Sequence, residues 1–422
     1  TTAKKERHTM LRAMYSGVSG LKAHEEMLDV IGNNIANVNT IGYKASSTEF
    51  ADVLSQTIAG AGPPVPLVGG TNATQVGLGV RVSGIATDFS QGADQQTGRS
   101  TDMAIEGNGF FVADLGGQQL YTRAGSLTFD ASGQLVNSDG AIIQGWMADS
   151  THTINANGPT TALVVPSGQL IPPVPTTNVV VGGNLPTNPL TSGNPPTAVL
   201  DSTINVYDAQ GTATSVTFDF TFTPGAGGAA GSWAVQAKDA KGGNIGSSQS
   251  LTFDANGNLT APTNYAITVN GQNIAVDLQQ PGSPLVSFGG TASVSAISQD
   301  GQATGTLQSI TVSKGGVISG VFSNGSSEVL GQVAVASFTN PSGLMKAGGS
   351  LYESSSNSGQ PQIGAPETGG RGTISSGVLE GSNVDLAQAF SDLVVAQRGF
   401  EANSKIISTS DQMLSALIAM KQ

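Results

Sequence analysis

Large apolar residues recur at helical spacing at both ends of the chain and almost nowhere between them. Near the N-terminal end, one row repeats every seven residues from Met10 onward, at Met14, Leu21, Leu28 and Ile35. Charged and polar residues occupy the opposite face, so the pattern predicts one amphipathic helix. Gly17 and Gly20 lie inside this helix and each weakens it by about 1 kcal/mol relative to alanine. We therefore expect the helix to need a partner for its stability.

The C-terminal segment repeats the same pattern. Its seven-residue row comprises Leu386, Leu393, Phe400, Ile407 and Leu414, with Phe390 and Ile418 in the adjoining row and Leu417 in a second apolar row. Ser382 stands three residues before Asp385, a spacing that predicts a capped helix start. We expect Glu401 to pair with Lys405, four residues later, on a polar strip. Together the two ends predict a coiled-coil-like pair, and two unrelated surface helices are the alternative.

The middle of the chain reads as β-sheet. Alternating and β-branched runs, such as residues 215–222 and 333–338, are separated by turns rich in Gly, Asn and Asp. Residues 126–135 read SLTFDASGQL and residues 250–259 read SLTFDANGNL. Each contains a strand, an Asp-x-x-Gly turn and the beginning of a return strand, so we expect two hairpins from different β domains.

These patterns predict an α+β, mainly β fold in which β domains are nested between the paired terminal helices. Pro and Gly density marks the linkers, most clearly at residues 60–70, 167–196 and 354–372. We expect five parts: a disordered extension at 1–9, an axial helical domain at 10–42 with 379–422, a linker region at 43–98 with 354–378, an inner β domain at 99–149 with 311–353, and an outer β domain at 150–310.

Composition and charge narrow the function. Gly supplies 57 of 422 positions, and charged residues make up only 11% of the chain, which is typical of β-rich, turn-rich proteins. A formal charge of -12 and the lack of a basic stripe argue against a nucleic-acid partner. There is no Cys, which excludes disulfides, thiolate metal sites and cysteine-derived crosslinks. The apolar runs are too short for a membrane span, and the N-terminus lacks the apolar core of a secretory signal.

Candidate catalytic and metal-binding residues are sparse. His8, His24 and His152 have no spacing that suits zinc or a catalytic triad, and a satisfied or solvated helix histidine is the simplest interpretation of His24. The loop that begins at Asp254 resembles a calcium loop, but its glycine comes too early for that motif. Asp102 with Glu106 is a conceivable glycosidase pair, although aromatic platforms for sugar are scarce. We expect no catalytic residues, no metal and no cofactor.

Long motifs stand at both ends and in the inner β region. The terminal motifs are MLRAMYSGVSGL at 10–21, IANVNTIGYK at 35–44, SNVDL at 382–386, AQRGFEAN at 396–403 and STSDQML at 408–414. The inner motifs are TDMAIEGNGFF at 101–111 and YTRAG at 121–125, continued by residues 140–146 and 331–341. They resemble the signatures of the bacterial flagellar rod and hook protein family. The large insertion at about 150–310 favours the hook type over the shorter rod subunits, and the residues before Met10 lie outside the usual pattern.

The resemblance implies a non-enzymatic structural subunit that self-assembles into a hollow, flexible helical tube outside the cell and transmits torque from rod to filament. It implies export through the flagellar type III apparatus, with the distal rod, the hook cap and the hook–filament junction protein as partners. The rival hypotheses are a distal rod or hook-associated axial protein and a secreted β-rich adhesin. We predict that the assembly interface consists of Met14, Leu21, Leu28, Ile35, Leu386, Phe390, Leu393, Phe400, Ile407, Leu414, Leu417 and Ile418.

Overall fold

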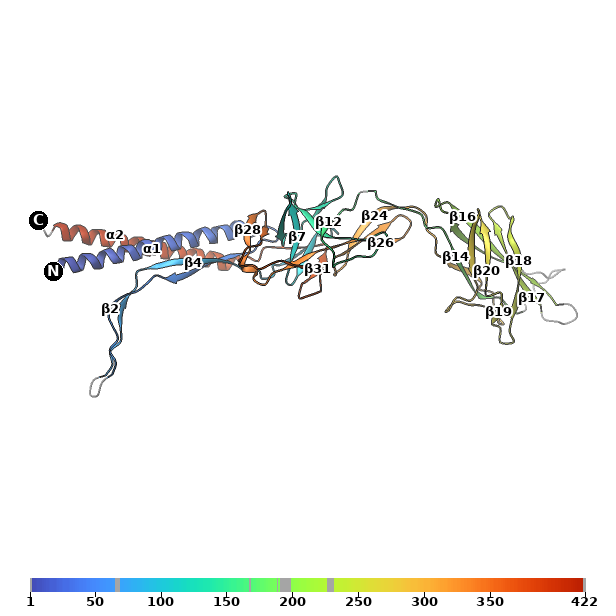
Figure 1. The fold of residues 1–422 in the computed structure, drawn as a ribbon, viewed down its shortest axis with the longest axis horizontal. Coiled ribbons are helices and arrows are strands. Elements are labelled where there is room, and N and C mark those ends of the chain that lie inside the picture. Colours follow the sequence, from blue (N-terminus) through green and yellow to red (C-terminus); the bar gives the residue numbers. More distant parts are fainter. Residues whose placement is uncertain are drawn as a thin grey trace. The chain divides into compact units, whose positions relative to one another are not determined.

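The computed structural model describes residues 2–64, 69–166, 168–187, 189, 199–225 and 231–419, and the side chains of residues 2–11 and 417 lie outside this description. The chain divides into two compact units (Figure 1). The first comprises Thr1–Pro166, Ile310–Ser319 and Val329–Gln422, and the second comprises Ser167–Ser309 and Gly320–Glu328. The architecture is mainly β with one long helix towards each end of the chain, so the predicted fold class is confirmed.

The first unit contains both helices, α1 (Thr2–Ala36) and α2 (Leu386–Ala419), which lie side by side in Figure 1. Helical backbone begins at Thr2, where we expected a disordered extension, because the segment before Met10 lacks Gly and Pro and is rich in helix formers. The cap of α2 also differs from the prediction. Asp385, rather than Ser382, caps the helix, since its Oδ1 accepts hydrogen bonds from the N–H groups of Ala387 at 2.8 Å and Gln388 at 3.2 Å.

Residues 43–98, for which we expected a linker, contain strands. They are β1 (Ser46–Asp52), β2 (Gln56–Ala59), β3 (Thr74–Val76), β4 (Val80–Thr87) and β5 (Asp94–Gln96). β1 pairs antiparallel with β4, β2 pairs with β3, and both β1 and β4 contact α1. These strands were not predicted from the sequence. They are short and largely exposed, they flank the Pro- and Gly-rich run at 60–70, and they carry little of the alternation that marks a half-buried strand.

A β body forms the rest of the first unit. Its strands are β6 (Met103–Glu106), β7 (Phe110–Leu115), β8 (Gln118–Thr122), β9 (Thr128–Phe129), β10 (Leu135–Val136), β11 (Ile142–Met147), β12 (Thr161–Ala162), β27 (Val335–Ser337), β28 (Met345–Gly348), β29 (Leu351–Glu353), β30 (Gln362–Gly364), β31 (Thr373–Ser376) and β32 (Val378–Glu380). The main sheet runs β11-β7-β8-β29-β28. β7 is buried on both faces, with Phe110 and Val112 in one apolar cluster and Phe111 and Ala113 in another, which explains its continuous apolar run.

Three strands cross the division between the units, β24 (Gly305–Val312), β25 (Val317–Phe322) and β26 (Ser327–Val333). The first unit also retains residues 150–166, which we had assigned to the outer β domain. Leu163 and Val165 are buried there, and β12 pairs with β11. The sequence prediction placed the boundary too early because the Pro-rich run begins only after this extra strand.

The second unit contains two five-stranded sheets. Its strands are β13 (Leu170–Ile171), β14 (Asn178–Asn184), β15 (Val199–Tyr207), β16 (Ala213–Thr223), β17 (Ser232–Asp239), β18 (Asn244–Phe253), β19 (Leu259–Ala261), β20 (Asn264–Val269), β21 (Gln272–Asp277), β22 (Leu285–Val286) and β23 (Ser295–Gln299). One sheet runs β15-β16-β17-β18-β19, and β14 pairs with β21, β22 and β23 in the other. The short strand β13 pairs instead with β24. One apolar core, which includes Phe218, Phe220 and Trp233, contains residues from both sheets.

The two predicted hairpins are confirmed, one in each unit. Phe129 pairs with Leu135, and Phe253 pairs with Leu259. In the second hairpin the Asp254 carboxylate accepts hydrogen bonds from the N–H groups of Asn256 and Asn258, each at 2.8 Å. The Asp254 carboxylate is therefore engaged by the backbone of its own turn. Neither helix has a described stretch that is long and apolar enough to cross a membrane.

Candidate assembly interface

The contact between α1 and α2 is lined by small residues. Gly17, Gly20 and Ala23 of α1 and Ala389 and Ala396 of α2 are buried. The backbones approach so closely that a Cβ at Gly20 would lie 2.7 Å from Oδ1 of Asn403. A Cβ on α2 at Gly399 would likewise lie 2.5 Å from the ring of His24. The glycines that looked like helix-weakening interruptions are therefore the points where the two helices touch.

The large apolar rows do not simply face each other. The half-buried members of the predicted interface are Met14, Leu21, Leu28, Ile35, Leu393, Ile407 and Leu414. Four others remain exposed in the subunit: Leu386 at 41%, Phe390 at 53%, Phe400 at 39% and Ile418 at 63%. The side chain of Leu417 lies outside the described residues. The neighbouring seven-residue row of α2, Ala389, Ala396, Asn403 and Ser410, is more deeply buried. Ile407 also reaches α1, where a Cβ at Gly17 would lie 3.2 Å from its Cγ1.

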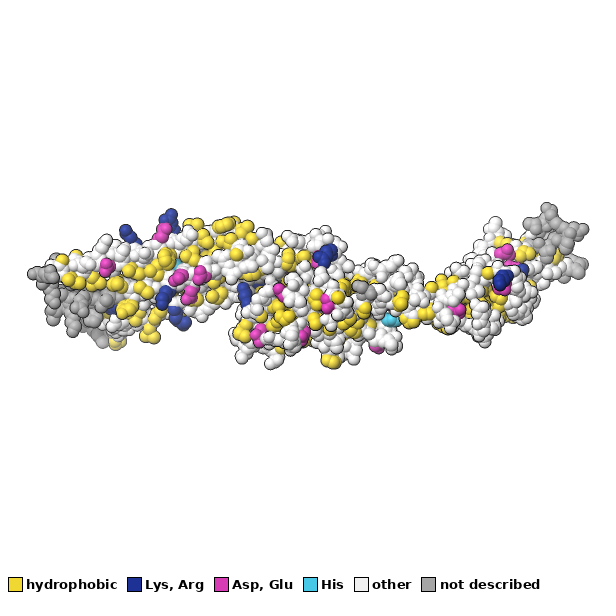
Figure 2. All heavy atoms as spheres, turned by 90° about the horizontal axis from the view of Figure 1, so that it is seen from above, with side chains coloured by type: hydrophobic (Ala, Val, Ile, Leu, Met, Phe, Trp, Pro, Cys, Tyr) yellow, Lys and Arg dark blue, Asp and Glu magenta, His cyan; other side chains and the backbone are white. Residues whose placement is uncertain are grey.

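An apolar surface is therefore left on α2. Val394, Val395, Ile406 and Met413 are also exposed there, and Figure 2 shows hydrophobic side chains along the surface of the helix pair. A contiguous exposed apolar surface on a folded protein usually marks an interaction site. We name these residues together the outer face of α2. Helical spacing places Leu386, Phe390, Val394, Phe400 and Ile418 on one side of the buried row and Val395, Ile406 and Met413 on the other.

Two smaller expectations need correction. Glu401 pairs with Arg398, at 3.0 Å between Oε2 and NH1, rather than with Lys405, and both partners are largely exposed. His24 is half-buried and is not the fully satisfied helix histidine of the first alternative. Its ring packs against Phe50 of β1, with 5.9 Å between centroids, and its Nδ1 has no hydrogen-bond partner in the described part of the chain. The surroundings of His24 could not be read from its own helix, because β1 supplies the contact, whereas Glu401 pairs within α2 at a spacing of three residues instead of four.

The end of α1 is tied to β1 by Asn34. Its side-chain amide donates to the carbonyl of Ser46 at 2.7 Å and its Oδ1 accepts from the N–H of Ser46 at 3.0 Å. The Tyr43 hydroxyl donates to the same Oδ1 at 3.1 Å. Asn34 is buried, so its fully used amide satisfies backbone groups that would otherwise be costly to bury. Asn34, directly before the IANVNTIGYK motif, thus holds the returning chain against the end of the helix.

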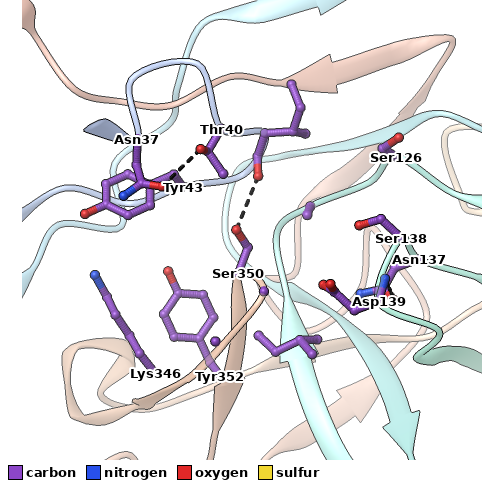
Figure 3. A pocket seen from close by; sticks show the side chains of 15 residues that line it. Asn37, Thr40, Tyr43, Ser126, Asn137, Ser138, Asp139, Lys346, Ser350 and Tyr352 are labelled. Carbon is purple, nitrogen blue, oxygen red and sulfur yellow. Dashed lines mark hydrogen bonds between the residues drawn. The ribbon is translucent and has the colours of Figure 1, made fainter. Parts of the chain in front are cut away.

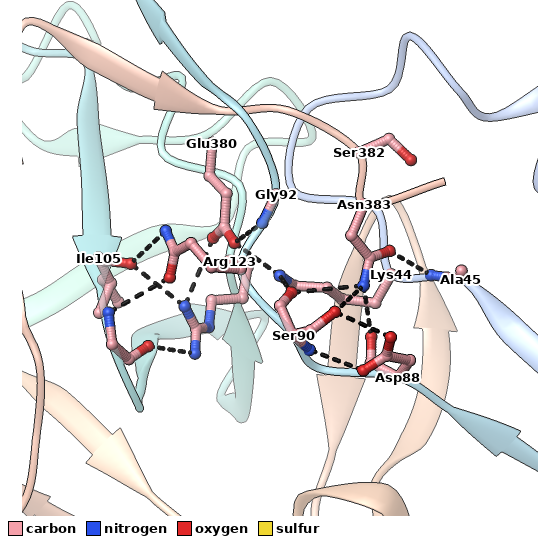
Figure 4. Close-up of polar contacts among 12 residues, drawn as sticks. Lys44, Ala45, Asp88, Ser90, Gly92, Ile105, Arg123, Glu380, Ser382 and Asn383 are labelled. Carbon is pink, nitrogen blue, oxygen red and sulfur yellow. Dashed lines mark hydrogen bonds and ion pairs between the residues drawn. The ribbon is translucent and has the colours of Figure 1, made fainter. Parts of the chain in front are cut away.

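A buried ion network lies where α1 and α2 meet the β body (Figure 4). Lys44 Nζ lies 2.6 Å from Glu380 Oε1, and Arg123 NH1 lies 3.4 Å from Glu380 Oε2. All three side chains are buried. Burial lowers the pKa of Lys44, although Glu380 acts to raise it, and burial also lowers the pKa of Arg123 against the opposing effect of Glu380. This network could not be predicted from the sequence, because its members are far apart in the chain.

A cavity of about 500 Å³ lies beside the network. As Figure 3 shows, Asn37, Thr40 and Tyr43 line one side of it, and Lys346, Ser350 and Tyr352 approach from the β body. Lys346 Nζ stands 5.0 Å from the centroid of the Tyr43 ring, a cation–π contact, and burial lowers the pKa of Lys346. The loop after α1 therefore meets the β body across a space as well as through packed side chains.

Comparison with known proteins places these features in a family. Four family models match: the flagellar basal body rod protein over residues 14–44, the hook protein FlgE/F/G D1 domain over 104–184, the FlaE D2 domain over 178–302 and the rod FlgEFG C-terminal region over 375–420. The flagellar hook protein FlgE of Borreliella burgdorferi is 39% identical over 450 residues, covering 98% of this chain and 100% of the relative. That of Treponema pallidum is 36% identical with the same coverage.

The chain belongs to the flagellar hook protein family. It is accordingly a structural subunit of the flagellar hook. The solved structure of Helicobacter pylori flagellar hook protein FlgE2 matches with a TM-score of 0.52 at 16% identity, covering 68% of this chain and 100% of that chain, and shows a common fold. Lys44, Arg123 and Glu380 each fall within a different family model, so the ion network joins regions that the family models treat separately.

Proposed function

We propose that this hook protein polymerises with copies of itself into a hollow, flexible tube outside the cell, and that the tube transmits torque from the rod to the filament without any catalytic reaction. The observation that carries the proposal is the outer face of α2, which leaves Phe390, Val395 and Ile418 more than half exposed in the subunit. Aromatic and aliphatic side chains left exposed on both sides of a helix contact are suited to bury against neighbouring helices. A second copy of the chain supplies such a helix.

The two layers of the subunit suit different mechanical tasks. The helix pair offers an apolar face that a polymer can bury, which favours strong contacts close to the tube axis. The second unit has a closed core and a surface rich in Ser, Thr, Asn and Gly, which favours shallow contacts that neighbours exchange during bending. We propose the distal rod, the hook cap, the hook–filament junction protein and the type III export apparatus as further partners.

The test replaces one anchor of the outer face. Phe390→Asp should raise the critical concentration for tube formation by about a hundredfold or more, because it removes an apolar contact and buries an unpaired carboxylate in each added subunit. Lys405→Ala, an exposed position on the same helix, is the matched control and should assemble almost normally. Sedimentation and negative-stain images measure assembly, and the melting transition of the β units should be unchanged in both variants.

The images also separate the alternatives. Curved tubes support the hook, and straight tubes would support a distal rod or hook-associated protein. If the wild type and the variant both remain monomeric at high concentration, the result would favour the adhesin hypothesis. Normal tubes from Phe390→Asp would contradict the assignment of the outer face to assembly.

A further inference from the structure

The connection between the helix pair and the β body consists of two crossing segments of backbone. Residues 88–93 lead from β4 to β5, and residues 381–385 lead from β32 to α2. β5 and β32 pair antiparallel, with Glu380 opposite Asp94. A single backbone segment can rotate about two soft dihedrals at each residue. A pair of segments resists twisting only if hydrogen bonds or ion pairs join the segments to each other, to the helix pair and to the β body.

Glu380 joins the first crossing segment to the second and to the loop after α1. Its Oε1 accepts hydrogen bonds from Lys44 Nζ at 2.6 Å and from the N–H of Gly92 at 3.0 Å. Its backbone carbonyl accepts from the N–H of Gly42 at 2.8 Å. Lys44 Nζ also donates to the carbonyl of Ser90 at 2.6 Å. The carboxylate and the lysine thus bond to all three segments of backbone that meet at this level.

Asn383 repeats the connection one step closer to α2. Its Oδ1 accepts from the N–H of Ala45 at 2.8 Å, and its Nδ2 donates to the carbonyls of Asp88 at 2.9 Å and Ser90 at 3.3 Å (Figure 4). The side chains of Glu380 and Asn383 therefore join the two crossing segments over several residues. Ordinary strand pairing ends at Glu380, so these bonds extend the pairing to the start of α2.

The β body holds the other side of the network. Arg123, directly after β8, bonds Glu380 and donates to the carbonyls of Ile105 at 3.2 Å and Gly107 at 2.8 Å. Phe89, on the first crossing segment, packs edge-on against Phe110, with 5.2 Å between ring centroids. The crossing segments are thus fastened to the core strand β7 as well as to one another.

We infer that Glu380, acting through Lys44 and Arg123, is the positioning residue that locks the helix pair to the β body and lets the two turn as one part under torque. The statement that torque acts on the subunit rests on the proposed function. The statement that Glu380 locks the helix pair to the β body does not. A buried ion pair contributes little net stability compared with apolar packing, but its geometry is demanding. The presence of three buried charged side chains at this junction therefore fits a role in fixing the orientation of the helix pair relative to the β body.

The test measures amide hydrogen exchange in the soluble full chain, which needs no tubes. Lys44→Met removes one charge while keeping a side chain of similar length. The amides of Gly42 and Gly92 should then exchange faster by on the order of a hundredfold, since one partner of a buried pair is lost. Amides of β7 should keep their protection. Lys44→Arg should restore slow exchange in large part, because it returns the positive charge.

Lys346→Met is the matched control. Lys346 lies beside the network and donates to Ser46 Oγ at 2.9 Å and to the backbone carbonyl of Lys44 at 3.5 Å. Among the described residues no bond joins it to Glu380, so Gly92 should keep its protection. Unchanged exchange at Gly42 and Gly92 in Lys44→Met would overturn the inference. Equal loss of protection in β7 would overturn it too, by showing that the network supports the whole β body. If Lys44→Met does not fold, exchange of the same amides is measured in Glu380→Gln, and the same outcomes support or overturn the inference.

Tubes provide the second readout. Where wild-type protein forms tubes, Lys44→Met tubes should form at a similar concentration but show a broader distribution of helical twist between subunits in electron micrographs. An unchanged twist distribution contradicts the lock. Failure of the wild type to form tubes would contradict the proposed function and leave the exchange result to decide the lock.

Discussion

The core of the second unit and the contact between the helices are built on opposite rules. In the second unit the largest side chains are the best buried, and Phe218 and Phe220 are fully inaccessible. In the helix pair the buried residues are mostly small, with Ile31 as the large exception, and Phe390 and Phe400 are left in contact with solvent. A core that hides its aromatics is complete within one chain. A helix pair that displays them reaches its full burial only with further chains.

The largest expected effect tests the completeness of the β core. Phe220→Ala should lower the free energy of unfolding of the second unit by about 3 to 5 kcal/mol, because it opens a cavity in a closed core. Chemical denaturation followed by tryptophan fluorescence measures this, since Trp233 lies in the same core. Phe288→Ala, at an exposed position of the same unit, should cost less than about 1 kcal/mol. Equal effects of the two substitutions would contradict the description of this core.

A smaller effect tests the small-residue contact. Gly20→Ala should weaken the pairing of α1 with α2 by about 1 to 3 kcal/mol, because the added methyl overlaps the Asn403 side chain. Gly32→Ala adds the same methyl to the same helix, where nothing lies within 4 Å, and should stabilise α1 by up to about 1 kcal/mol. Thermal melting followed by far-UV circular dichroism compares them. The same sign for both substitutions would exclude a close contact at Gly20.

The smallest effect concerns a turn of the second unit. Hydrogen bonds from the backbone N–H of Asn258, and next from its side chain, lower the pKa of the Asp254 carboxyl. A carboxyl whose folded pKa lies below its unfolded value of about 4 stabilises the protein above that pH and loses this contribution as the pH falls. Urea denaturation should therefore show a steeper stability loss between about pH 5 and pH 3 in the wild type than in Asp254→Asn. Parallel pH profiles would refute this contribution.

The hydrophobic pattern located both helices because large apolar residues at seven-residue spacing are visible without knowledge of a partner. It did not predict which row faces the other helix. Ala389, Ala396, Asn403 and Ser410 also stand seven residues apart, but small residues are common on any helix face. Their role becomes visible only when Gly20 is found opposite Asn403 and Ile31 is found packed against Ala389 and Ala396. The small residues let the helices approach closely, and large side chains such as Leu28 and Leu393 pack beside them.

Sequence alone determined the class of the fold, the two turns at Asp130 and Asp254, and the family, because these depend on local patterns and long motifs. Tertiary structure decided the rest. Lys44, Arg123 and Glu380 are ordinary charged residues in the sequence, and only the return of the chain to the same junction places them together. Burial there removes the water that would otherwise solvate them, so each charge depends on the others for its partners. Such dependence between distant residues has no counterpart in local sequence.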